Sequence, residues 1–150
     1  MRYVTTQLTP AEAITSLGGD SDEDFDQLLL AATKGLEEVV TLTHTAAVSR
    51  HWWHDAEGTP TQRNLGEIIA LIHSELSEGL EAARKDLQSD HITDYTGLEE
   101  ELADAIVRIC DLAGALNLRL GDALVAKVLY NLKRTDHDLA NRQAPSGKQF

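Results

Sequence analysis

Residues 64–80 read NLGEIIALIHSELSEGL, and this stretch sets the expectation for the fold. Its apolar residues return every three or four positions, which is the period of an amphipathic helix. Asn64 precedes the first of them and is a preferred helix N-cap. We therefore predict a helix from residue 65 to about residue 87. Its expected buried stripe consists of Leu65, Ile68, Ile69, Ile72, Leu76 and Leu80.

Residues 96–117, TGLEEELADAIVRICDLAGALN, predict a second helix of the same kind. Thr96 followed three residues later by Glu99 is a capping-box pattern. The stripe expected here is Leu98, Leu102, Ala105, Ile106, Ile109, Leu112, Ala113 and Leu116. Helical periodicity also covers residues 22–50 and 121–133, and no segment alternates as a strand does. The expected fold class is an all-α bundle of four to five helices.

We expect three regions along the chain: an N-terminal arm or short helix at 1–20, a helical domain at 21–135, and a basic tail at 136–150. The chain has 150 residues, of which 42% are hydrophobic and 25% charged, a balance typical of a globular domain. Its net charge of −12 makes it a poor partner for nucleic acid. No apolar run has the roughly 20 residues needed to span a membrane. With a single cysteine, Cys110, and no secretory pattern, we expect a cytoplasmic protein.

Two acidic pairs are the candidate chemical groups. Glu75 and Glu78 are three residues apart on one predicted helix, and Glu101 and Asp104 repeat that spacing on the next. Side chains three apart lie on one helix face, and antiparallel packing of the two helices would let the pairs meet. Such pairs are often only solvated, but two of them beside apolar stripes favour a cation. Carboxylate oxygens suit Mg²⁺ or Mn²⁺.

A di-iron centre is the main rival for such a cluster, and the sequence argues against it. Di-iron bundles use a glutamate followed three residues later by a histidine. None of the six histidines has a glutamate three positions before it, and His73 lies on a different side of its helix from Glu75.

These motifs resemble the MazG-type all-α nucleoside triphosphate pyrophosphohydrolases. The shared marks are Glu-x-x-Glu on one helix and Glu-x-x-Asp on the next. Ser74 stands where many members carry a further glutamate, so a ligand for a second metal is missing. Residues 46–53 and 127–150 are similar to other conserved segments of bacterial and phage-like members.

The resemblance implies an acid anhydride hydrolase that cleaves (deoxy)nucleoside triphosphates to monophosphate and pyrophosphate, with a role in nucleotide-pool cleansing. It implies that Glu75, Glu78, Glu101 and Asp104 are both catalytic and Mg²⁺ ligands. It also implies a homodimer or homotetramer. Open alternatives are a related diphosphohydrolase for dUTP or phosphoribosyl-ATP, and a non-catalytic helical interaction or regulatory module.

Substrate contacts are expected from two further groups of residues. A basic helix face and the tail could bind phosphates through Lys127, Asn131, Arg134 and Lys148. Trp52 or Trp53 could stack on the base, because base stacking on aromatic rings tolerates any sequence. Adjacent tryptophans can equally be anchors of a core and of an interface.

Overall fold

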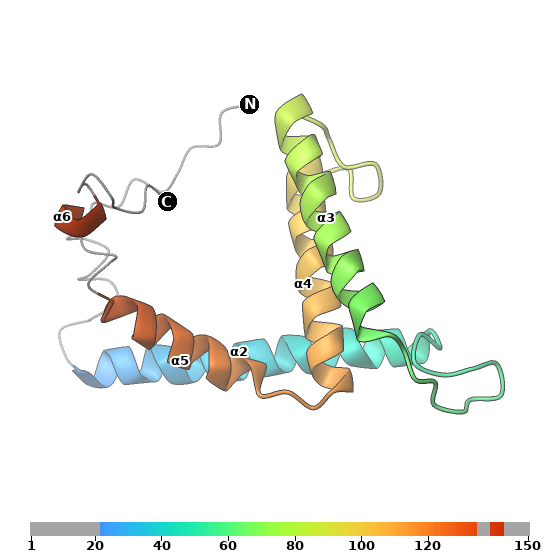
Figure 1. The fold of residues 1–150 in the computed structure, drawn as a ribbon, viewed down its shortest axis with the longest axis horizontal. Coiled ribbons are helices and arrows are strands. Elements are labelled where there is room, and N and C mark those ends of the chain that lie inside the picture. The colour runs from blue at the N-terminus through green and yellow to red at the C-terminus, as the bar shows by residue number, and fades with distance from the viewer. Residues whose placement is uncertain (1–21, 135–138, 143–150) are drawn as a thin grey trace. The chain divides into compact units, whose positions relative to one another are not determined.

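The computed structural model describes residues 22–134 and 139–142. They form α2 (Asp22–Ser49), α3 (Leu65–Lys85), α4 (Gly97–Ala115), α5 (Leu120–Leu132) and the short α6 (Leu139–Arg142) (Figure 1). The described residues contain no strand, so the predicted all-α class is confirmed. The predicted arm at 1–20 and most of the tail, including Lys148, lie outside the described residues.

The chain divides into two compact units, and α2 contributes to both. One unit contains residues 38–118, which comprise the second half of α2, α3 and α4. The other contains the first half of α2, to residue 37, and the described residues from 119 onward, which include α5 and α6. None of the helices described is both long enough and apolar enough to cross a membrane.

α3 and α4 form an antiparallel hairpin joined by a tightly hydrogen-bonded turn. Asp86 ends α3 in the left-handed region, at φ 55°. The Leu87 amide donates to the Ala82 carbonyl at 3.0 Å, and the Gly97 amide donates to the Leu87 carbonyl at 2.9 Å. A Cβ at Gly97 would lie 3.0 Å from the Cβ of Ala82, so glycine lets the two helices approach here. This approach fixes their register.

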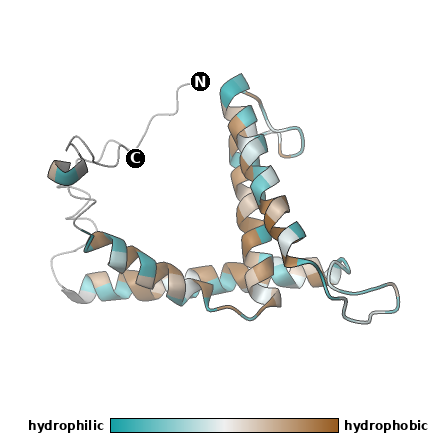
Figure 2. Ribbon diagram, in the orientation of Figure 1, coloured by the Kyte–Doolittle hydropathy of each residue, from teal (hydrophilic) through white to brown (hydrophobic). Residues whose placement is uncertain are grey.

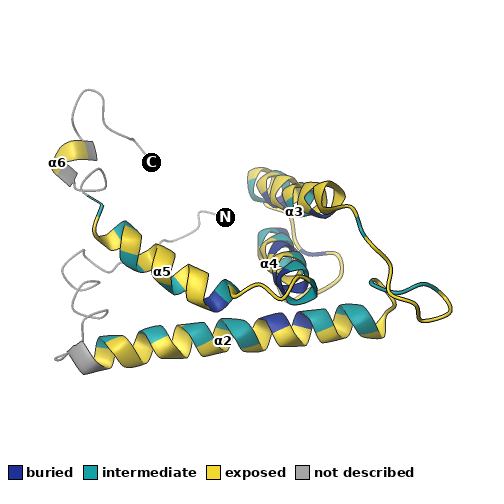
Figure 3. Cartoon of the chain, turned by 60° about the horizontal axis from the view of Figure 1, so that its bottom comes forward, coloured by how far each residue is buried: buried dark blue, intermediate teal, exposed yellow. Residues whose placement is uncertain are grey.

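The buried face of α3 differs from the predicted stripe. It consists of Ile68, Glu75, Gly79 and Ala82, while Leu65, Ile69, Leu76 and Leu80 remain 47–62% exposed. The prediction was right for Ile68 and wrong for these four residues, because the seam with α4 includes small residues that bring the backbones close. On α4, Leu102 and Ile106 are likewise exposed. Figure 3 shows buried and exposed residues alternating along the helices.

α4 also packs against the second half of α2. Val40 and Thr43 are buried on α2, and Cys110 on α4 is 1% exposed, as expected of a core cysteine. A Cβ at Gly114 would lie 2.5 Å from the Cβ of His44, so the two helices meet closely at this glycine.

The second unit is held together by a contact between α5 and the first half of α2. The Gly121 amide donates to Glu37 Oε1 at 2.9 Å. A Cβ at Gly121 would lie only 2.7 Å from the Thr33 carbonyl oxygen. Glycine therefore allows α5 to start directly against α2.

Candidate metal centre

The two metal-motif helices start at firmly capped residues. Asn64 Oδ1 accepts from the Gly66 amide at 2.8 Å and so begins α3. Thr96 and Glu99 form the predicted capping box: the Thr96 amide donates to Glu99 at 2.7 Å, and the Glu99 amide donates to Thr96 Oγ1 at 3.3 Å. These caps fix the residue at which each helix begins, and so the positions of the acidic residues along it.

Gly79 sets the distance between the helices at the acidic pairs. A Cβ there would lie 3.3 Å from the Cβ of Glu101, so α3 and α4 also approach closely at this level. Glu75 and Glu78 precede Gly79 on α3, and Glu101 faces them from α4.

Three of the four predicted carboxylates converge. Glu75, Glu78 and Glu101 each offer one oxygen, and these oxygens lie within 4.8 Å of one another. Glu75 is 6% exposed, so it occupies the seam itself and not its edge. Asp104 lies about one turn farther along α4 and is not one of the three. The structure therefore contains an acidic triad that could bind a metal ion.

The electrostatics of this triad are those of crowded carboxylates. Burial, a hydrogen bond with Glu75 and the charges of Glu78, Glu75 and Asp104 raise the pKa of Glu101 to about 7. The pKa of Asp104 is also raised, first by burial and then by the charges of Glu75 and Glu100. Without a cation, the cluster therefore holds a proton near neutral pH.

The donor set fits a small hard cation. Ligand oxygens of one Mg²⁺ lie about 3–4 Å apart, because each Mg–O distance is about 2.1 Å. The triad needs only side-chain adjustment to reach this spacing. A divalent cation in place of the proton would offset the cost of burying a charged Glu101 and relieve the repulsion among the carboxylates, which together raise its pKa.

Arg108 is the positive charge at the triad. Its Nε donates to Glu75 Oε1 at 2.6 Å, and its side chain is 27% exposed. The Arg108 charge opposes the rise in the pKa of Asp104. Asp104 and Arg108, one turn apart on α4, thus place a carboxylate and a positive charge at the acidic triad.

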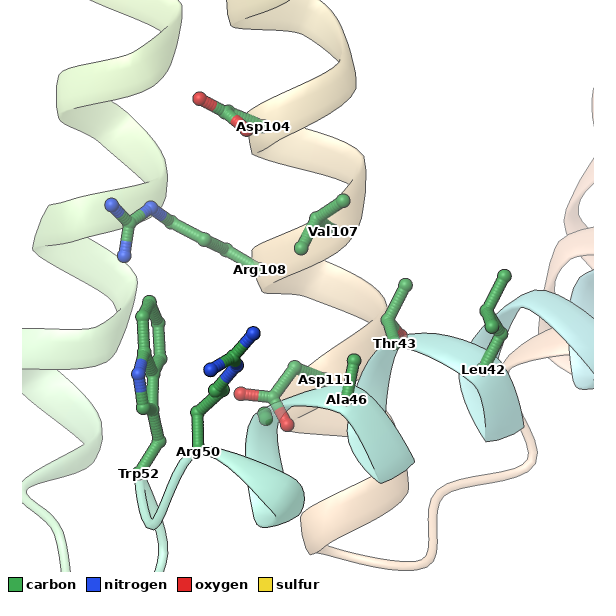
Figure 4. Close-up of a pocket in the computed structure, with 10 residues that line it drawn as sticks. Leu42, Thr43, Ala46, Arg50, Trp52, Asp104, Val107, Arg108 and Asp111 are labelled. Carbon is green, nitrogen blue, oxygen red and sulfur yellow. The ribbon is translucent and has the colours of Figure 1, made fainter.

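A cavity of about 500 Å³ lies beside Asp104 and Arg108. Its walls come from the end of α2, the following loop and α4, and they combine apolar side chains with two arginines (Figure 4). Trp52, which is 51% exposed, and Arg50 stand at this cavity. The cavity is large enough for part of a small organic ligand.

The two tryptophans have different surroundings. Trp53 Nε1 donates to both oxygens of Asp111, at 2.9 and 3.1 Å, and His44 Nδ1 lies 2.8 Å from Asp111 Oδ1. Asp111 is buried, so it fastens the loop to α2 and α4. Trp53 is therefore an anchor, whereas Trp52 lines the cavity.

The predicted phosphate-binding residues Lys127, Asn131 and Arg134 belong to the second unit. Lys127 Nζ lies 4.7 Å from the ring centre of Tyr130, and Arg134 Cζ lies 5.8 Å from the same centre. Both cations thus contact one aromatic ring. Asn131 Oδ1 is buried without a hydrogen-bond partner among the described residues.

Sequence reasoning missed Arg108 and Asp111 as site residues. The signal was present, because Glu101, Asp104, Arg108 and Asp111 follow one another at intervals of three and four along α4. The prediction stopped at the second acidic pair.

Comparison of the chain with models of known families, with curated proteins and with solved structures finds no match.

Proposed function

We propose that this protein is a Mg²⁺-dependent nucleoside triphosphate pyrophosphohydrolase, as the resemblance of its acidic motifs implies. The observation that carries the proposal is the convergence of Glu75, Glu78 and Glu101 within 4.8 Å at the seam of α3 and α4. Asp104 is the fourth proposed ligand, reached by a change of side-chain conformation. Mn²⁺ can replace Mg²⁺ at such an oxygen site.

The chemistry assigns separate tasks to the chain's residues. When bound, the cation neutralises substrate phosphates and makes a water more acidic. A water at the phosphorus next to the nucleoside would attack through its oxygen, and the bond to the leaving pyrophosphate would break. One of the glutamates takes the proton of the water. The products are a nucleoside monophosphate and pyrophosphate.

Substrate recognition is proposed for the residues that the sequence predicts for it. Trp52 has the exposure and the cavity position needed to stack on a base, which contributes roughly 1–3 kcal/mol. Lys127, Asn131 and Arg134 remain the proposed phosphate contacts of the second unit, together with Lys148. The expected role is removal of unwanted nucleotides from the pool.

A second copy of the chain is the proposed partner. Leu65, Leu76 and Leu80 on α3 are 47–62% exposed, and Ile106 on α4 is 52% exposed. Figure 2 shows hydrophobic residues recurring along both helices. Isolated chains seldom leave apolar faces of this extent in water. A homodimer or homotetramer would cover them.

The deciding experiment is release of pyrophosphate from a panel of nucleoside triphosphates, with Mg²⁺ and with a chelator. The panel includes dUTP and phosphoribosyl-ATP, the substrates of the related diphosphohydrolases. We expect Mg²⁺-dependent turnover that falls at least a hundredfold in Glu101→Gln and in Asp104→Asn, since removing a group that stabilises the reacting charge costs about 10²–10³ in kcat. Glu81→Gln, at an exposed glutamate paired with Lys85, is the matched control.

Two results would reject the proposal. One is absence of turnover for every nucleotide, which is the result expected of a non-catalytic interaction module. The other is an unchanged rate in both carboxylate variants.

A further inference from the structure

We propose that Arg108 binds the phosphate attached to the nucleoside, an inference that rests on the proposed function. Arg108 is then a substrate-binding residue and not only the counter-ion of a buried glutamate.

The guanidinium of Arg108 is held at one edge and open at the other. Its Nε donates to Glu75 at 2.6 Å. A guanidinium has five N–H donors in a rigid fork, so the two terminal amino groups keep donors for a second anion. Figure 4 shows the group reaching from α4 toward α3, close to the indole of Trp52 in that view, and both residues line the cavity. Anchoring at Glu75 aims the fork before any ligand arrives.

The order of residues along α4 decides which phosphate Arg108 would meet. Glu101 and Asp104 come first, Arg108 is one turn later, and Asp111 follows at the level of the tryptophan loop. If the outer phosphates reach the carboxylates through the cation and the base lies beside Trp52, the phosphate nearest the sugar would lie beside Arg108, since Asp104, Arg108 and Trp52 line one cavity. The pyrophosphate portion would lie on the far side, toward Glu101.

A purely structural role for Arg108 makes a different prediction. If it served only to neutralise Glu75, a lysine at the same position would suffice, because its charge is equal. Lysine lacks the planar fork, however, and cannot hold Glu75 and two phosphate oxygens together. Arg108→Lys therefore separates the two roles.

The test measures binding, not turnover. Isothermal calorimetry with Mg²⁺ present gives the affinities of wild type, Arg108→Lys and Arg108→Gln for the ribo- and deoxyribonucleoside monophosphates and for inorganic pyrophosphate. Mn²⁺ titration without nucleotide monitors the acidic triad. Arg84→Gln is the control, since Arg84 is 72% exposed and lies at the end of α3, outside the cavity. If Arg108→Gln does not fold, Arg108→Lys carries the test.

We expect both Arg108 variants to lose about ten- to hundredfold in affinity for the monophosphate, as for a hydrogen bond to a charged group. Pyrophosphate affinity, and Mn²⁺ affinity in Arg108→Lys, should stay within about threefold of wild type on the same grounds. Unchanged monophosphate binding in Arg108→Lys would overturn the inference. So would equal losses for monophosphate, pyrophosphate and Mn²⁺, or a wild type that binds no monophosphate.

The results also separate this inference from the proposed function. If the wild type hydrolyses triphosphates but the Arg108 variants bind the monophosphate as tightly as it does, only the inference about Arg108 is rejected. A wild type that hydrolyses nothing but binds monophosphates through Arg108 rejects only the proposed reaction.

Discussion

At the scale of single residues, Glu101 has a strongly raised pKa. Its raised pKa, about 7, means that the folded protein keeps a proton which the unfolded chain releases near pH 4.5. The folded state therefore binds more protons between these two values. By linkage, this group's contribution to stability is complete below pH 4.5 and is lost as the pH rises through about 7.

We therefore predict that Glu101→Gln stabilises the cation-free protein at pH 8, by about 1–2 kcal/mol, since each unit of pKa shift corresponds to about 1.4 kcal/mol before solvent screening. Glutamine keeps a donor for Glu75 without adding charge. Thermal melts in chelator at pH 5 to 8 measure the effect. The variant should lose part of the pH dependence seen in wild type, while Glu81→Gln should keep it.

A cation reverses this trend, because it replaces the proton. Mg²⁺ or Mn²⁺ should raise the melting temperature of wild type more at pH 8 than at pH 6, and should not raise that of Glu101→Gln by the same amount. An equal shift at the two pH values would argue against the triad as the binding site.

Asp111 is the second residue whose burial has a measurable consequence. It accepts from Trp53 and contacts His44, so Asp111→Ala leaves the indole N–H without its acceptor. We predict a loss of about 1–3 kcal/mol in the free energy of unfolding, the usual cost of an unsatisfied buried donor. Urea unfolding followed by Trp53 emission in a Trp52→Phe background measures it. Trp52→Phe alone should change stability little, since that side chain is half exposed.

At the scale of helices, small residues decide how closely the elements approach. Gly114 meets His44, and an added Cβ would lie 2.5 Å from the His44 Cβ. Gly114→Ala should therefore destabilise the protein by about 1–3 kcal/mol through overpacking. Gly35→Ala is the matched control in α2, where nothing lies within 4 Å of the added Cβ. It should stabilise by roughly 0.5–1 kcal/mol, because alanine favours helix. Denaturant unfolding of both variants gives the two signs.

Glycines at the helix contacts also explain which features of the fold the sequence could predict and which it could not. Helix bounds followed from periodicity and caps such as Asn64 and Thr96, since these signals are local. The convergence of Glu75, Glu78 and Glu101 also followed from spacing, whereas Asp104 is not part of that triad. The buried face did not, because it depends on the register that Gly79 and Gly97 set between two helices. Glu75 is buried because α3 packs against α4, and no local sequence pattern predicts this burial.

At the scale of the whole molecule, α3 and α4 expose many large apolar side chains, and this exposure to water is unfavourable. Single exposed leucines are ordinary, but several exposed apolar side chains on one hairpin, among them Leu76, Leu80 and Ile106, form the surface for which we propose association. Cyclic twofold dimers are the commonest way for a chain to cover such a surface with itself.

We predict that Leu80→Asp, or Ile106→Asp, converts the assembly to a monomer. Leu80 is 62% exposed in the single chain, so the new carboxylate harms no internal packing there, but it would be buried without a partner in the assembly. Light scattering after gel filtration, over a range of protein concentrations, gives the mass directly. Thr93→Asp, which adds the same charge to the exposed connecting loop, should leave the mass unchanged. A wild type that is monomeric at every concentration would exclude a second copy as the cover, and these faces would then belong to a different partner.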